Sequence, residues 1–395
     1  MSTTPLPGTP RLLRAINDRA ALELLLARGP LTRSQIGELT GLSKVTASQL
    51  VERLVSRGLV SGVGEQAGGR GPNAQLYAVR PDSAYVVGVD IEPENVVAAC
   101  ADICGEVHSR IELSTKDTDD PVGVVHRAVL EAAASAHAPA ESVRRVVLGT
   151  PGLVDPGTGD LAFAYDLPRW QRGLLAALRE DLNIPVSFEN DVNLVAIAEA
   201  HRGAAQGVSD FVLLWVGRGV GLAIVLGGRL WRGYSGAAGE VGWIPVPGAP
   251  VHRDPSHKAK GGFQQLVGAE AVRTIAREHG FKGSSGAAAI AAAVAAGSGG
   301  GAVLDELASR LALGIAAVCV VLDPPLVVLA GEVNIAGGAA LAQRVEHEVA
   351  AIAPVAPRVM VASGPAEAVV EGALRTALEA VRDEVFGSTV DEAAA

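Results

Sequence analysis

Two short polar sets in the middle of the chain hold the side chains best suited to binding a small molecule. Glu189-Asn190-Asp191 follows an apolar segment, and the adjacent amide and carboxylate of Asn190 and Asp191 suit two neighbouring hydroxyls of a polyol. The same residue types also cap helices, so a purely structural role is the alternative. Glu240 closes a glycine-rich loop. Trp243 lies three residues further on, where an indole can stack on an apolar sugar face or fill the core.

Strands and helices that alternate along the chain must position these side chains. The predicted elements form two sets. The first has strands at 84–91, 95–103, 106–114, 144–148 and 185–188 and helices at 121–137 and up to 203. The second has strands at 211–216, 220–226 and 326–330, an apolar strand that starts at Glu240, and helices within 268–297 and 302–322. Two α/β lobes with a cleft between them are the economical arrangement, because ligands bind at strand ends near such junctions.

Three glycine-rich turns, at 149–152, 217–221 and 233–240, are expected to face this cleft. Glycine lets the backbone approach a ligand closely, although each turn taken singly is also ordinary chain punctuation.

The first eighty residues have a different pattern, typical of a helix-turn-helix. An apolar helical segment at 20–27 ends at Gly29-Pro30, and Thr32 and Gln35 then form a capping box. The short helix that follows stops at Gly41, and Ser43 can cap a second helix that runs to about residue 58.

The outward face of this second helix predicts DNA binding. Its apolar side is Ala47, Leu50, Val51 and Leu54, so Val45 and Gln49 point away from the core. Gln49 can pair an adenine and Val45 can touch a thymine methyl, whereas basic side chains suit phosphates. The candidate DNA-binding residues are Arg33, Ser43, Lys44, Val45, Thr46, Ser48, Gln49, Arg53 and Arg70. The alternative is a small helical cap with an exposed charged face.

Two strands, at 59–63 and 75–79, follow the second helix and complete a winged helix. The tip between them, 68–72, has Arg70 as its single large side chain and suits a narrow minor groove. Charge supports this assignment, since residues 1–80 carry a net charge of +5 and the remainder −15. A positive segment on an acidic body can meet a polyanion while the body does something else.

Composition excludes several other classes of protein. With 49% hydrophobic residues the chain is not disordered, and three cysteines rule out a disulfide scaffold and suit a reducing compartment. Neither an apolar signal core nor a membrane span is evident, so we expect a cytoplasmic protein.

Taken together, these motifs resemble the ROK family of repressors, open reading frames and sugar kinases, in its branch of transcription regulators. The resemblance rests on the winged helix, Val87-Gly88-Val89-Asp90, Gly149-x-Pro151-Gly152, Glu189-Asn190-Asp191 and Gly236-Ala237-Ala238-Gly239-Glu240-Val241-Gly242, and covers about 14–385. It implies an α/β fold with an N-terminal winged helix-turn-helix and a two-lobed, actin-like (sugar-kinase-like, ribonuclease H-like) domain. It also implies a sugar or sugar-phosphate effector and a homodimer or homotetramer.

Domain boundaries follow from the same resemblance. We expect the winged helix at 1–80, a first lobe at 81–200 with a C-terminal helix at 366–385 packed against it, a second lobe at 201–365 and a disordered tail at 386–395. The implied effector-binding residues are Gly152, Asn190, Asp191, Glu240, Trp243 and Gln265.

The chain departs from the family pattern where kinases bind phosphates. The kinases have a Gly-Gly-Thr-Lys loop after the first-strand aspartate, but here Glu92, Pro93 and Glu94 follow Asp90-Ile91. Acids repel phosphates, and Arg218 replaces a small hydroxyl residue in the second phosphate turn. Asp191 matches the catalytic base, yet a base without a phosphate donor transfers no phosphoryl group. No catalytic residue or cofactor is therefore expected.

The zinc site of the family is altered as well. Members use one histidine and three cysteines, but here Trp243 replaces the histidine and the segment 252–265 has no cysteine. His252 and His257 with Asp254 are the remaining donors, and isolated loop histidines are usually solvated. We expect no metal, with Cys100, Cys104 and Cys319 as core thiols.

The leading hypothesis is a DNA-binding transcription regulator, acting as a repressor on an inverted-repeat operator, with a degenerate kinase-like sensor. The alternatives are a sugar kinase with an appended DNA-binding head and an effector-independent dimerisation scaffold.

Overall fold

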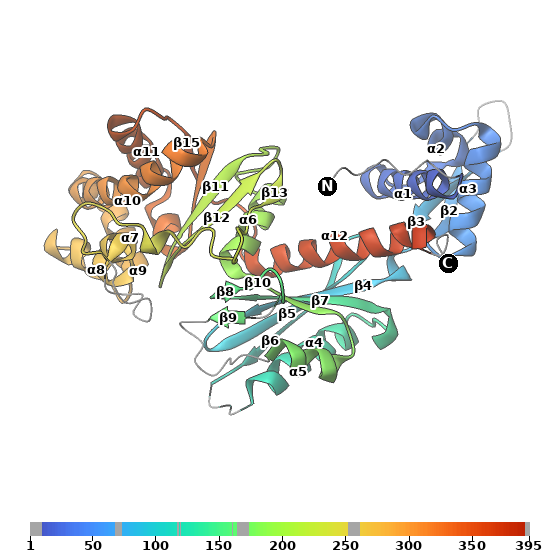
Figure 1. The fold of residues 1–395 in the computed structure, drawn as a ribbon, viewed down its shortest axis with the longest axis horizontal. Coiled ribbons are helices and arrows are strands. Elements are labelled where there is room, and N and C mark those ends of the chain that lie inside the picture. Colours follow the sequence, from blue (N-terminus) through green and yellow to red (C-terminus); the bar gives the residue numbers. More distant parts are fainter. Residues whose placement is uncertain are drawn as a thin grey trace.

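The computed structural model describes residues 10–67, 73–116, 118, 120–159, 161–163, 174–251 and 261–391. Within these ranges the chain forms an N-terminal head and two α/β lobes, and helix α12 (Ala368–Asp391) runs between the head and lobe 1 (Figure 1). The predicted Arg70, His252 and His257 lie outside the described residues.

The head is a winged helix-turn-helix, as expected. Its elements are α1 (Pro10–Arg28), β1 (Leu31–Thr32), α2 (Arg33–Thr40), α3 (Lys44–Ser56), β2 (Val60–Gln66) and β3 (Ala74–Val79). The capping box is present, because the backbone N–H of Gln35 donates to Thr32 Oγ1 at 3.2 Å and Thr32 N donates to Gln35 Oε1 at 2.8 Å. Gly41 ends α2 with φ 71°, a conformation that glycine adopts without strain.

Lobe 1 is a five-stranded sheet in the order β10-β7-β4-β5-β6. Its elements are η1 (Pro81–Ser83), β4 (Tyr85–Ile91), β5 (Asn95–Asp102), β6 (Val107–Ser114), α4 (Pro121–Ser135), η2 (Ala140–Ser142), β7 (Val143–Thr150), α5 (Leu174–Leu182), β10 (Val186–Asn190) and the separate hairpin β8 (Leu153–Val154)–β9 (Leu161–Phe163). Helices α4 and α5 pack on one face of the sheet, and α12 packs on the other.

Lobe 2 is a second five-stranded sheet, in the order β13-β12-β11-β14-β15. Its elements are β11 (Phe211–Val216), β12 (Val220–Leu226), β13 (Arg229–Leu230), η3 (Val241–Trp243), α7 (Gly262–Val267), α8 (Ala269–Glu278), α9 (Gly286–Ala295), η4 (Gly297–Gly300), α10 (Gly301–Leu322), β14 (Leu326–Ala330), α11 (Glu332–Ile352) and β15 (Arg358–Val361). Helices α7 to α11 cover one face. Helix α6 (Asp191–Arg202) packs on the other face and so joins the two lobes.

Helix α12 lies unusually close to lobe 1. A Cβ on Gly88 of β4 would lie 2.8 Å from the Val370 carbonyl oxygen, and one on Gly372 would lie 2.1 Å from the Leu194 carbonyl oxygen. Any larger residue at either position would separate the helix from β4 or from α6. The other end of α12 packs on α1, and Phe386 and Leu22 belong to one hydrophobic cluster that spans head and lobe 1.

Three sequence expectations are wrong. Residues 386–391 continue α12 instead of forming a disordered tail, because Phe386 is 1% exposed in the shared core. Cys104 is exposed in a turn after β5, whereas Cys100 and Cys319 are buried as expected. The segment after Glu240 is the short 3-10 helix η3, because Trp243 N donates to the Glu240 carbonyl oxygen.

Candidate functional site

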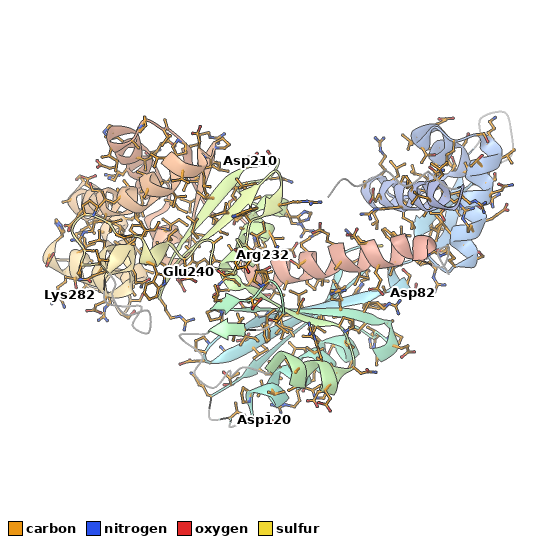
Figure 2. The ribbon with its side chains drawn as sticks, viewed as in Figure 1. Asp82, Asp120, Asp210, Arg232, Glu240 and Lys282 are labelled. Carbon is orange, nitrogen blue, oxygen red and sulfur yellow. The ribbon has the colours of Figure 1, made fainter. Side chains whose placement is uncertain are left out.

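The cleft between the lobes contains four of the six predicted effector-binding residues. Gly152, Asn190, Asp191 and Glu240 all line one polar pocket. The three glycine-rich turns reach the same pocket, through Gly152, Gly219 and Gly239 among others. Figure 2 labels Glu240 and Arg232, which both come from the chain between β13 and η3, in the region where the two lobes meet. Residues from the turn after β7, from α6, from the β11–β12 turn and from the loop before η3 are thereby brought together.

Asn190 has a structural role at the start of α6. Its Oδ1 accepts a hydrogen bond from Asn193 N at 3.2 Å, which caps the helix, and its Nδ2 donates to the Gly152 carbonyl oxygen at 2.9 Å. The cap is the structural alternative raised from sequence. The second bond also fixes the 149–152 turn against α6, so Asn190 shapes the pocket that it lines.

Glu189 links the two lobes, a role that the sequence did not indicate. The carboxylate is buried and accepts from Arg232 Nη2 at 2.6 Å and from Asn193 Nδ2 at 2.8 Å. Arg232 comes from the loop after β13 in lobe 2. This ion pair holds the loop that carries Glu240 against the end of β10 in lobe 1.

Trp243 and Gln265 do not line the cleft pocket. Gln265 is exposed on α7, and its neighbour Gln264 is the residue that contacts the β11–β12 turn, accepting from Val220 N at 3.0 Å. Trp243 is half-buried within η3. The aromatic ring at the cleft belongs to Trp215, which lies in the continuous apolar run of β11 and gave no separate signal in the sequence.

A smaller adjoining pocket is strongly acidic. Asp90, Glu92, Asp191 and Glu332 line it, and Arg218 is the cation among its lining residues. Burial, and then the negative charge of Asp191 and Glu92, raise the pKa of Asp90 to about 8. Such a pocket disfavours a polyphosphate, because several carboxylates face one guanidinium.

The outward face of α3 is accessible in the head. Lys44, Val45, Thr46 and Gln49 are exposed, with Val45 67% exposed, whereas Ala47, Leu50, Val51 and Leu54 are buried. Ser48 is half-buried between the two faces. Ser43 caps α3, since its Oγ accepts from Thr46 N at 3.2 Å and lies 2.8 Å from Thr46 Oγ1.

Two arginines in the predicted DNA-binding set have partners within the head. Arg53 Nε donates to Asp18 Oδ2 at 3.0 Å, and its Nη2 bonds the other carboxylate oxygen of this fully buried aspartate. Arg33 lies over the Tyr77 ring at 5.2 Å, and its Nη1 lies 3.5 Å from Glu52. The sequence expectation of a free phosphate-binding Arg53 missed the role of joining α3 to α1.

One group of possible metal ligands exists among the described residues, at Asp102, Glu106 and His108, away from the cleft. Asp102 Oδ1 accepts from three backbone N–H groups, and Oδ2 lies 2.7 Å from His108 Nε2. These bonds account for the cluster as a turn. Among the described residues, no helix is long and apolar enough to span a membrane.

Comparison with family models supports the architecture. Residues 86–380 match the model of the ROK family, and residues 16–71 match that of the MarR family. The xylose repressor of Caldicellulosiruptor bescii is 28% identical over 60% of this chain and 61% of its own length. The DNA-binding transcriptional dual regulator NagC of Escherichia coli is 28% identical over 60% of this chain and 59% of its own. The matches thus span about three fifths of these relatives.

Solved structures show the same fold. A ROK family transcriptional regulator, described as a homologue of the E. coli MLC protein, aligns over 96% of this chain and 99% of its own, with a TM-score of 0.76 at 20% identity. A ROK hexokinase from Thermus thermophilus aligns over 76% of this chain and 99% of its own, with a TM-score of 0.64 at 27% identity. The two lobes therefore have the fold of a ROK hexokinase, and the chain including its head has the fold of a ROK regulator.

Proposed function

Because this chain belongs to the ROK family and has a winged helix ahead of its two lobes, we propose that it is a sequence-specific DNA-binding transcription regulator. The observation that carries the proposal is the exposed face of α3, where Val45 and Gln49 lie opposite a fully apolar core face. The repressors among its relatives support repression rather than activation. We propose that it acts as a repressor in the cytoplasm.

DNA recognition uses three kinds of contact in this proposal. Gln49 reads an adenine and Val45 a thymine methyl in the major groove, since an amide and a small apolar group match those base edges. Lys44 lies at the start of α3 and binds phosphates. Arg70 enters the minor groove from the wing tip. A homodimer or homotetramer presents two such heads to an inverted repeat.

The experiment that tests this proposal compares Gln49→Ala combined with Arg70→Ala against the unaltered chain in footprinting on genomic fragments. We expect specific protection to disappear, while circular dichroism shows an unchanged fold, because Gln49 is exposed. Ser56→Ala, on the exposed C-terminal end of α3, is the matched control and keeps the footprint. An undiminished footprint in the double variant contradicts the proposal.

The cleft is proposed to sense a sugar or a related small effector rather than to phosphorylate one. Gly152, Asn190, Asp191 and Glu240 support a polyol ligand. Trp243 and Gln265 contact the effector only if the loop around η3 moves towards the cleft when the effector binds. The effector changes DNA affinity through its different affinities for two arrangements of the lobes.

A sugar kinase with an appended head is the second candidate, favoured by the shared lobes of the hexokinase. It requires ADP release from ATP with a hexose, lost in Asp191→Asn. The acidic pocket around Asp90 and Glu332 opposes it, and we expect no turnover. The family's zinc does not fit this chain either, because Cys100 and Cys319 are buried in different lobes and cannot share one metal.

An effector-independent dimerisation scaffold is the third candidate. Calorimetry against mono- and disaccharides and their phosphates separates it from a sensor, since specific micromolar binding is incompatible with a scaffold.

A further inference from the structure

A cavity larger than the cleft pocket lies at the junction of the head with lobe 1. Its volume is about 640 Å³, against about 120 Å³ for the cleft pocket. Helix α1, helix α6, helix α12 and the turn after β5 contribute its walls. The lining residues that carry the argument are Leu26, Ile197, His201, Arg375, Arg382 and Phe386.

The inner wall of this cavity is basic. Arg375, Arg382 and His201 are half-buried there. Both guanidinium groups approach the same point, because a Cβ on Gly105 would lie 3.6 Å from Arg382 Nη2 and 3.8 Å from Arg375 Nη1. Burial first, and then the charge of Arg375, lower the pKa of Arg382 and of His201. The positive charge of the two guanidinium groups therefore reaches His201 and disfavours its protonation.

Of the carboxylates at this junction, Glu371 pairs with Arg375 of the inner wall, and Glu23, Glu379 and Asp383 are exposed. Glu23 and Asp383 are exposed and both bind Arg19, at 2.8 and 2.5 Å. Glu371 pairs with Arg375 Nε at 3.2 Å, which leaves the Nη atoms of Arg375 to other partners. Arg382 donates from Nε and Nη2 to the Ile103 carbonyl oxygen, a neutral acceptor. Glu379 is exposed at the rim.

We propose that this cavity is a second ligand site, which binds a small phosphate-bearing molecule between the head and lobe 1. Guanidinium N–H groups bind phosphate oxygens through charge-assisted hydrogen bonds, and Arg375 Nη1 and Arg382 Nη2 approach one point at Gly105. The volume suits a phosphorylated metabolite. The apolar walls, Leu26, Ile197 and Phe386, contact the carbon part of the ligand.

A ligand here contacts α1 of the head and α12 of the body at once. It therefore stabilises the arrangement in which the head is docked on α12, and it shifts DNA affinity only if DNA prefers another arrangement. This makes the site distinct from the cleft, which contains no residue of the head. The binding claim itself does not depend on the regulatory role proposed above.

The test is calorimetric titration of the full chain with inorganic pyrophosphate at constant ionic strength, with sodium chloride as the reference. We expect saturable binding and a rise in the unfolding temperature. Arg375→Gln is expected to weaken pyrophosphate binding at least about tenfold, as loss of a charged hydrogen bond does. Glu379→Gln is expected to strengthen it, because a repelling charge leaves the rim.

Three further variants keep the result interpretable. Arg277→Gln, on the exposed end of α8, controls for total charge and leaves binding unchanged. Asp191→Asn leaves it unchanged as well, since Asp191 belongs to the cleft. If Arg375→Gln fails to fold, Arg382→Gln replaces it with the same expected weakening. The proposal is overturned if pyrophosphate behaves like chloride, or if the Arg375, Arg382 and Glu379 variants all bind as the unaltered chain does.

Discussion

At the scale of single residues, the cleft of this ROK protein is defined by carboxylates. Asp90 ends the strand that kinases of the family use near phosphates, and here it lies with Glu92 and Glu332 around the same small pocket. Burial, and then the negative charges of Asp191 and Glu92, favour the protonated form of Asp90 and raise its pKa to about 8.

Asp90→Asn is therefore expected to stabilise the protein, and increasingly so as pH rises. In the folded state the pKa of Asp90 is raised above its ordinary value of 3.8, so folding is favoured below about pH 4 and that contribution is lost as pH rises towards 8. Asparagine removes the titration, and the gain at pH 8 relative to pH 4 is at most about 6 kcal/mol. Urea unfolding across pH measures it.

Glu278→Gln is the control, because Glu278 is exposed at the end of α8. It is expected to give the same shift in unfolding free energy at every pH. A flat profile for Asp90→Asn contradicts the buried, like-charged environment.

At the scale of elements, the head depends on one buried ion pair. Asp18 of α1 is 0% exposed and holds the 31% exposed side chain of Arg53 on α3 through two hydrogen bonds. The pair fixes the angle between α1 and the helix that is proposed to enter the major groove. If either partner is removed, the other is left as an unpaired charge inside the head, which lowers its stability.

Asp18→Ala is expected to destabilise the head by about 3 kcal/mol, because Arg53 then loses its carboxylate while α1 still covers it. Asp18→Leu with Arg53→Met is expected to recover most of the loss, since an apolar pair fills the same space. Hydrogen exchange of the α1 and α3 amides measures both variants. Equal protection in Asp18→Ala and the unaltered chain contradicts the assigned role.

At the scale of the whole molecule, α12 joins the cleft to the head. Val369, near its N-terminal end, lines the acidic pocket, and Phe386, near its other end, is buried against the head. Figure 1 shows the helix lying along the lobe 1 sheet with its far end at the winged helix. The head and lobe 1 thus share a hydrophobic core, and we expect them to unfold together.

Phe386→Ala is expected to break this coupling. Removing a fully buried ring costs about 3–5 kcal/mol at the shared core, so the head then melts before the lobes. Differential scanning calorimetry of the full chain is expected to show the head and lobe 1 melting together before the change and separately after it. Val320→Ala, at a 53% exposed position on α10, leaves the melting profile unchanged. Separate melting of the head in the unaltered chain contradicts a shared core.

Local patterns in the sequence determined much of this protein. The capping box of Thr32 and Gln35, the core face of α3 and the strands at 211–216, 220–226 and 326–330 all follow from neighbouring residues, and the structure confirms them. Cap geometry and hydrophobic periodicity act over a few residues, which is why they can be read directly. The polar set at 189–191 was recognisable for the same reason.

Only the tertiary structure decided which distant groups meet. Arg53 with Asp18, Glu189 with Arg232, and Phe386 with the head are contacts between segments far apart in the chain, and no local period encodes them. The tertiary structure also places Trp215, and not the predicted Trp243, at the cleft pocket. It shows that α12 continues through residues 386–391. The reason is that burial of these groups becomes favourable only when both partners have left water together, so it depends on packing rather than on either segment alone.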